Sequence, residues 1–153
     1  MVSLKNKSKG FTIVELLIVI VVIGILATLV IVTFTGIQQK ARDSKRKTDI
    51  GAVQAALESY YSSNNTYPTF ADLNDSTWRT AHMKGFDANA LQDPKSNSNQ
   101  VVASMPASGY AYVYTVTPAS CSDADGSSTP CTNYTISAKL ESDGSTVSKQ
   151  SNN

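Results

Sequence analysis

The fold of this 153-residue chain is decided by the stretch Lys9-Gly10-Phe11-Thr12-Ile13-Val14-Glu15-Leu16-Leu17. The stretch joins a short basic leader to an apolar run from Phe11 to Phe34, in which Glu15 is the one charged residue. A helix over this run is about 36 Å long, which is enough to cross the hydrocarbon layer of a membrane. A charge inside such a helix is costly unless it finds a partner, so Glu15 is the first candidate functional residue.

A cleaved secretory signal is an alternative interpretation of this apolar run. The run is too long for the apolar core of such a signal, and it carries a charge inside it. The small residues that follow it form no convincing cleavage site. We therefore interpret residues 11–36 as a hydrophobic helix that spans a membrane or fills the core of a helical assembly.

Helical periodicity continues beyond the apolar run. Residues 38–49 are rich in charge and contain no proline, and apolar residues then recur at helical spacing. We expect one helix from Phe11 to about Tyr61, ending at the Ser/Asn cluster 62–65. Residues 37–62 form its amphipathic half, and the single apolar stripe of that half needs a domain packed against it. The stripe consists of Ile50, Val53, Leu57 and Tyr60.

Residues 63–153 supply the expected partner domain. Residues 110–117 and 133–140 are rich in aromatic and β-branched residues and are bounded by turn residues, which predicts two antiparallel strands. A third, short strand is expected at residues 146–148, after the Asp143-Gly144 turn signal. Residues 70–99 are expected to be mostly loop, with a turn of helix near residues 71–73. The predicted fold class is α+β: a long N-terminal helix packed on a small antiparallel sheet.

The leader ending in Gly10, the Phe11-Thr12 start and Glu15 at the head of a long apolar helix resemble a type IV prepilin. Prepilins are the precursors of type IV pilins and of type II secretion pseudopilins. The resemblance extends from Lys9 to about Pro68, and its N-terminal motif is highly specific. It implies a pilin-like fold, in which residues 1–10 are a class III prepilin leader peptide.

The resemblance also implies how the N-terminus is processed and used. A membrane-embedded prepilin peptidase is expected to cut between Gly10 and Phe11 and to methylate the new amine of Phe11. In assembled filaments of the family, the glutamate faces the amine of a neighbouring subunit, which assigns Glu15 and Phe11 to assembly. The alternative is that Glu15 pairs with the amine of its own chain, one helical turn away.

One position departs from the family pattern. Family pilins commonly carry a proline in the middle of this helix, where this chain has Val32. Gly24 and Gly36 remain as weak points, because glycine in a helix interior costs about 1 kcal/mol. Both glycines are equally explained as small residues that permit close helix contact.

The positive charges near the apolar run bear on membrane orientation and on partners. More Lys and Arg follow the run than precede it, so the positive-inside rule alone favours the opposite of the family topology. The leader motif decides the orientation instead: a single-pass precursor in the cytoplasmic membrane with its C-terminus outside, and a cell-surface filament after assembly. The basic cluster at residues 40–47 is interpreted as a solvated helix face or an inter-subunit salt-bridge surface. With a formal net charge of +1, the alternative of a DNA-binding stripe is unfavoured.

Cys121 and Cys131 are an even pair in a domain expected to be exported, which suggests a disulfide, with two reduced cysteines as the alternative. Between them, Asp123 and Asp125 are a weak calcium candidate, because carboxylates suit Ca²⁺ and major pseudopilins carry a calcium loop in this half. A polar turn is the favoured interpretation of this segment, so no cofactor is expected.

The sequence contains no recognisable catalytic motif, and no enzymatic activity is expected. His82 is the only histidine, and we interpret it as a surface residue of a loop-like stretch. The favoured function is a major pilin, a structural subunit that forms a homo-oligomeric helical filament. Its expected partners are the membrane, the prepilin peptidase, and a pilus assembly platform with its ATPase. Two alternatives stay open: a minor pilin or pseudopilin of a secretion or DNA-uptake machine, and a single-pass anchored binding protein that never polymerises.

Overall fold

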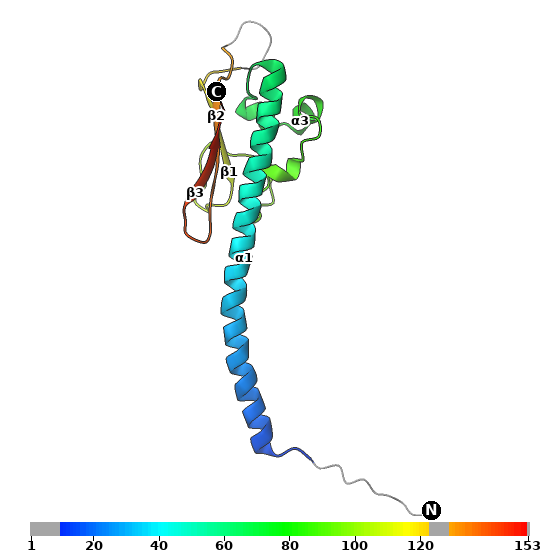
Figure 1. The fold of residues 1–153 in the computed structure, drawn as a ribbon, viewed down its shortest axis with the longest axis vertical. Coiled ribbons are helices and arrows are strands. Elements are labelled where there is room, and N and C mark those ends of the chain that lie inside the picture. The colour runs from blue at the N-terminus through cyan, green and yellow to red at the C-terminus, as the bar shows by residue number, and fades with distance from the viewer. Residues whose placement is uncertain (1–9, 123–128, 153) are drawn as a thin grey trace, which may run out of the picture. The chain divides into compact units, whose positions relative to one another are not determined.

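The computed structural model describes residues 10–122 and 129–152, and its contacts divide the chain into two compact units, Met1–Gln38 and Gln39–Asn153 (Figure 1). Helix α1 runs from Ile13 to Asn64 and contributes to both units. The described part of the second unit also contains helices α2 (Phe70–Asn74) and α3 (Ser76–His82), the 3-10 helix η1 (Ala88–Leu91), and strands β1 (Tyr112–Thr117), β2 (Asn133–Lys139) and β3 (Thr146–Gln150).

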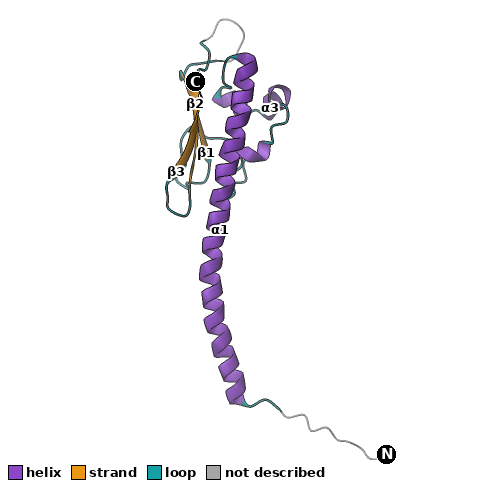
Figure 2. Ribbon diagram, viewed as in Figure 1, coloured by secondary structure: helices purple, strands orange, loops and turns teal. Residues whose placement is uncertain are grey.

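Helix α1 is continuous for 52 residues, through Gly24, Gly36 and position 32 (Figure 2). The predicted long helix is confirmed, although it begins two residues later and ends three residues later than expected. In the first unit, every described Val, Ile, Leu and Phe side chain from Phe11 to Ile37 is at least 48% exposed. By length and composition α1 could cross a membrane, since its most apolar window has a mean hydropathy of 3.3.

In the second unit, the apolar stripe of α1 forms one side of the core. Ile50, Val53 and Leu57 are fully buried and Tyr60 is 8% exposed, as the helical spacing predicts. These side chains belong to one hydrophobic cluster with buried residues of the sheet and of the short helices. The stripe therefore completes a core that three short strands could not form alone.

The strands form one antiparallel sheet in the order β1-β2-β3. Tyr114 lies opposite Ile136 in the first pair, and Ala138 lies opposite Val147 in the second. Alternate residues of β2 are buried, as expected for a strand with one face on a core. The predicted α+β class is confirmed, and β3 extends two residues beyond its predicted end.

Buried tyrosines outside α1 donate hydrogen bonds to carboxylates of the helix. The Tyr112 hydroxyl donates to Asp49 at 2.7 Å, and the Tyr134 and Tyr67 hydroxyls donate to Glu58 at 2.9 and 3.1 Å. Burial raises the pKa of Tyr112 and Tyr134, and the neighbouring carboxylates raise it further. These phenols therefore remain neutral donors at physiological pH.

The prediction that residues 70–99 are mostly loop is wrong, because α2, α3 and η1 occupy much of this segment. Each element has a side-chain cap: Thr69 accepts from the N–H of Asp72, Asp75 from those of Thr77 and Trp78, and Asp87 from that of Asn89. Helices this short carry too few apolar residues to show a period, so their caps are the main sequence signal. His82 is exposed, as expected, but it ends α3 rather than lying in a loop.

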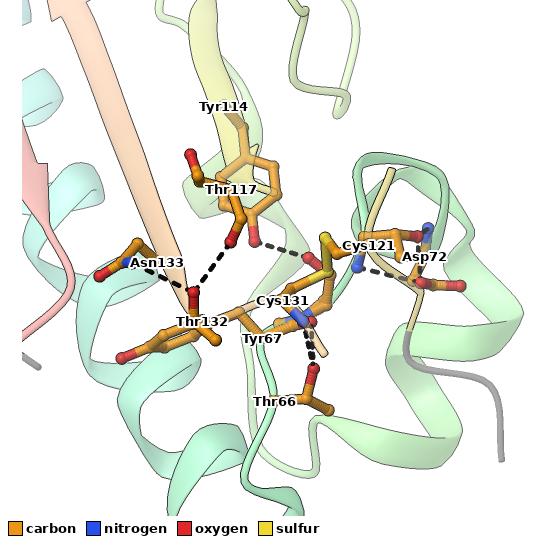
Figure 3. The surroundings of a disulfide bond; sticks show 11 residues. Thr66, Tyr67, Asp72, Tyr114, Thr117, Cys121, Cys131, Thr132 and Asn133 are labelled. Carbon is orange, nitrogen blue, oxygen red and sulfur yellow. Dashed lines mark hydrogen bonds between the residues drawn. A yellow bond between two sulfur atoms is a disulfide. The ribbon is translucent and has the colours of Figure 1, made fainter. Parts of the chain in front are cut away.

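Cys121 and Cys131 form the expected disulfide, which closes the connection from β1 to β2 (Figure 3). The Cys131 N–H donates to the Thr66 hydroxyl at 3.0 Å, and the Cys131 carbonyl accepts from the Tyr67 N–H at 2.9 Å. The bond thus lies beside the segment that leaves α1. The calcium candidates Asp123 and Asp125 lie outside the described residues, so that hypothesis stays a prediction.

Candidate assembly site

The candidate assembly site is at the start of α1, where Thr12 and Glu15 bond to each other. The Thr12 N–H and hydroxyl both donate to Glu15 Oε2, at 2.8 and 2.7 Å. In return the Glu15 N–H donates to the Thr12 hydroxyl at 3.3 Å. This reciprocal pattern is a capping box, in which Thr12 is the residue before the helix and Glu15 its third residue.

The capping box gives the Glu15 carboxylate partners inside its own chain. Those partners sit at the positive end of the helix dipole, which also favours a negative charge. Thr12 is a site residue beyond those predicted from the sequence, although the spacing Thr-x-x-Glu before an apolar run is the signature of a capping box.

The predicted cleavage bond, between Gly10 and Phe11, precedes the helix. Both residues are exposed and outside regular secondary structure, and the Phe11 side chain is 89% exposed. Exposed, non-helical backbone is where proteolysis concentrates. The geometry is therefore compatible with the processing that the sequence predicts.

The basic cluster on α1 is only in part the solvated helix face that the sequence predicts. Arg46 is fully buried and bonds to three carboxylates of its own chain. Its Nε and Nη2 donate to Asp93 at 2.7 and 2.9 Å, and its Nη1 donates to Asp43 at 2.9 Å and to Glu141 at 2.7 Å. Lys40, Lys45 and Lys47 are exposed, so the prediction of a solvated face holds for those three residues, and the inter-subunit surface stays a prediction.

Glu141 is the second centre of this ion-pair network, which comprises Arg42, Asp43, Arg46, Asp93, Lys95 and Glu141. The Arg42 guanidinium donates to both of its oxygens, at 2.8 and 2.7 Å, and Lys95 Nζ lies 2.9 Å from Oε2. The bond from Arg42, with those from Lys95 and Arg46, lowers the pKa of Glu141 despite burial. The network holds the Asp93 segment and the turn after β2 against α1.

Asp43 extends the network to the backbone of that turn. Its two oxygens accept the N–H groups of Glu141 and Ser142, at 2.8 and 2.9 Å. Burial acts to raise the pKa of Asp43, but these N–H bonds and the Ser142 and Arg46 side chains outweigh it and lower the pKa. Both buried carboxylates are therefore held in their charged form.

Comparison with known proteins finds relatives of the N-terminal part of the chain. Residues 5–31 match the family described as the prokaryotic N-terminal methylation motif. Type II secretion system core protein G is 45% identical over 65 residues in Aeromonas hydrophila and 44% identical over 64 residues in Escherichia coli K12. Type IV major pilin protein PilA of Myxococcus xanthus is 30% identical over 103 residues. The chain is therefore similar to type IV pilins and type II secretion pseudopilins, through its N-terminal motif and long helix.

These matches differ in how much of the pilin-like chain they cover. The two core G proteins align with 42% of this chain and over 46% and 44% of their own lengths. PilA aligns with 67% of this chain and over 47% of its own length. The chain thus spans less than half the length of these relatives. No solved structure matches it significantly.

The family match contains Gly10, Phe11, Thr12 and Glu15, which are the residues at the start of α1. The fold agrees with the family, because a long N-terminal helix and a small antiparallel sheet are the expected pilin-like architecture. The roles of these residues in cleavage, methylation and assembly stay predictions.

Proposed function

We propose that this pilin-like chain is a structural subunit that is cleaved after Gly10 and polymerises through α1, as the pseudopilin of a type II secretion machine. The observation that carries the proposal is the exposed apolar half of α1, headed by the capped Glu15. A helix that is apolar on all sides needs lipid or other helices around it. Such a helix can be dissolved in a membrane first and packed against other subunits later.

Glu15 would determine the register of packing. Lipid tails are as apolar as Ile and Val, so moving α1 from lipid to a filament gains little transfer free energy. Specific pairing must then choose the correct stagger between subunits. Cleavage at Gly10 would place a cationic amine on Phe11, and a neighbouring subunit in register could offer that amine to the Glu15 carboxylate.

The Thr12–Glu15 capping box adds a step to this scheme. Before assembly, the Thr12 N–H and hydroxyl satisfy one oxygen of the carboxylate. The subunit therefore has a partner for its charge while it remains single in the membrane. Pairing with a neighbour's amine would replace or supplement this contact.

Other partners and the location follow from the same proposal. The precursor would be a single-pass protein of the cytoplasmic membrane with its C-terminus outside, processed by a prepilin peptidase. Extraction from the membrane requires work, which an assembly platform with a cytoplasmic ATPase would supply. The chain itself would have a structural role without enzymatic activity or a cofactor.

A major pilin of a type IV pilus, the function favoured by the sequence, is the second candidate. The core G matches have the higher identities and favour the pseudopilin. The PilA match reaches over 103 residues, beyond the helix, and favours the major pilin. Abundance on purified surface filaments would support a major pilin, whereas location in the cell envelope with secreted proteins retained in its absence would support a pseudopilin.

Glu15→Ala tests the assembly role common to both candidates. We expect the variant to reach the membrane and to yield a mature protein that begins at N-methylated Phe11, but to form no filaments. Mass spectrometry of the membrane fraction checks processing, and electron microscopy of sheared filaments checks assembly. Thr28→Ala, a polar residue of the same helix outside the capping box, is the matched control. Filaments of normal number and length from Glu15→Ala would refute the proposal.

A further inference from the structure

Arg79 on α3 is a buried cation whose charge has no carboxylate partner among the described residues. Arg79 is only 7% exposed, and its Nη1 donates to the Leu73 carbonyl at 2.6 Å. Within the described part of the chain, the ion pairs involve Arg42, Lys45, Arg46 and Lys95, and Arg79 forms none. Among the described residues, no buried side-chain nitrogen lacks a hydrogen-bond partner, so the Arg79 nitrogens without one are accessible to a ligand. A largely buried cation without a carboxylate partner favours an anion as that ligand.

A cavity of ≈ 210 Å³ is lined in part by Arg79. The residues that line it include Arg79, Lys84 and Ser76, and no Asp or Glu is among the described lining residues. The described lining therefore includes two cationic residues and two hydroxyl residues, Ser76 and Thr80, and no opposing carboxylate. Its volume exceeds that of a small tetrahedral anion and leaves room for the group that carries one.

The local backbone holds Lys84 at this cavity. The Phe86 N–H donates to the Met83 carbonyl at 3.1 Å, which closes a turn around Lys84 and Gly85. Gly85 has a φ of +81°, the left-handed conformation that glycine adopts most readily in such turns. The two cations thus come from different elements, α3 and the turn after it.

Capping of α2 explains only part of the Arg79 environment. The bond to the Leu73 carbonyl satisfies one backbone acceptor near the end of that helix. A guanidinium has five N–H donors, so four remain for other acceptors. A capping role also gives no reason for Lys84 to face the same cavity.

We propose that Arg79 and Lys84 form a binding site for a phosphate group in its doubly charged, terminal form. A phosphate carries about −1.5 to −2 charges at neutral pH and three or more acceptor oxygens, which matches two cations. A carboxylate carries one charge and would leave one cation unbalanced. The guanidinium fork suits phosphate oxygens bidentately, and the Lys84 ammonium adds a point charge.

The test is binding of inorganic phosphate to the full-length protein in a non-ionic, phosphate-free detergent at constant ionic strength. We expect a saturable shift of the Arg79 Nε–Hε resonance in ¹H–¹⁵N spectra, and saturable heat in calorimetry. Dimethyl phosphate, a singly charged diester, and acetate are the comparison ligands, and each should bind at least about 10-fold more weakly because it carries less charge. A diester or acetate that binds as tightly as phosphate would overturn the charge-matching proposal.

Variants locate the site. Lys84→Ala and Arg79→Lys should each weaken phosphate binding about 10-fold, because one loses a charge and the other the planar fork. Lys149→Ala removes an exposed lysine of β3 and should leave binding unchanged. Since Lys84 is exposed, its variant decides the matter even where Arg79→Lys fails to fold. If Arg79 only caps α2, Arg79→Lys will lower stability without changing phosphate binding, and the proposal fails.

Discussion

Arg46 shows how a residue that looks like a surface charge can be a core residue. It is fully buried, and its guanidinium meets Asp43, Asp93 and Glu141 at 2.7 to 2.9 Å. The planar fork of arginine suits such multiple pairing, and every carboxylate in the set is bonded to it directly. Removing Arg46 should therefore lower the free energy of unfolding far more than breaking an exposed ion pair would.

Arg46→Ala should lower the free energy of unfolding by about 3–5 kcal/mol, because it leaves three carboxylates buried without their shared cation. Urea unfolding of the full-length protein in non-ionic detergent, followed by Trp78 fluorescence, measures the change. Lys47→Ala, at the exposed neighbouring position, is the matched control and should stay within about 0.5 kcal/mol of the parent. Equal losses in the two variants would contradict the buried role of Arg46.

Stability should depend on pH through Glu141. Its pKa is lowered in the folded state, so its contribution is complete above the unfolded value of about 4.3 and is lost as pH falls toward the folded value. The free energy of unfolding should decline as pH decreases from about 5 to 3. In Glu141→Gln this decline should be shallower. Part of it should remain, because the pKa of Asp43 is also lowered in the folded state. If the free energy of unfolding had the same pH profile in the parent and the variant, Glu141 would be excluded as a source of the pH dependence.

These residues differ in how far the sequence predicts them. Glu15 is visible as a candidate because one charge interrupts an apolar run, and its partner Thr12 has a local spacing signal. Arg46 has one local partner, Asp43, three residues before it, but its other partners Asp93 and Glu141 are 47 and 95 positions away. Pairing between residues so far apart in the sequence depends on the tertiary fold. From the sequence alone, the cluster is therefore predicted to be a charged helix face.

At the scale of elements, the disulfide joins Cys121, which follows β1, to Cys131, which precedes β2. It closes a short loop and lies beside the chain that leaves α1 (Figure 3). A covalent link of this kind stabilises mainly by restricting the unfolded chain.

Replacing Cys121 and Cys131 together by Ser should lower the free energy of unfolding by about 2.5–3 kcal/mol, the value expected for closing a loop of this length. Urea unfolding of parent and variant gives the difference. The reduced parent protein is the control and should unfold like the double variant. The role assigned to the disulfide would be wrong if reduction and substitution both left the midpoint unchanged.

The longer elements were predicted better than the short ones. Strands β1 and β2 carry runs of aromatic and β-branched residues between turn residues, and α1 carries a strong apolar pattern. Helix α3 has seven residues and η1 has four, too few for a period to appear. Their caps, Asp75 and Asp87, were in the sequence but are also common in loops.

At the scale of the whole molecule, the described core lies within one unit. Every buried apolar residue falls between Ile50 and Leu140, and the ion-pair network begins at Arg42. The apolar half of α1 adds exposed surface and no described core residue. The unit Gln39–Asn153 therefore holds the described interactions that stabilise its fold.

A fragment of residues 39–153 should be soluble without detergent and should unfold within a few degrees of the full-length protein, because it keeps this core. Circular dichroism during heating measures both transitions. A fragment of residues 48–153 is the matched comparison: it lacks Arg42, Asp43 and Arg46, so it should unfold at a clearly lower temperature. Aggregation of the longer fragment, or equal midpoints for the two fragments, would contradict this division of the molecule.

The ion-pair network also has an evolutionary consequence. Asp43, Arg46, Asp93 and Glu141 have buried side chains, and the three carboxylates share Arg46, so a change at one position leaves a buried charge without a partner. Joint replacement by apolar residues of similar volume costs far less than any single step. Related sequences should therefore keep all four residues or lose them together, and intermediates with one member missing should be rare.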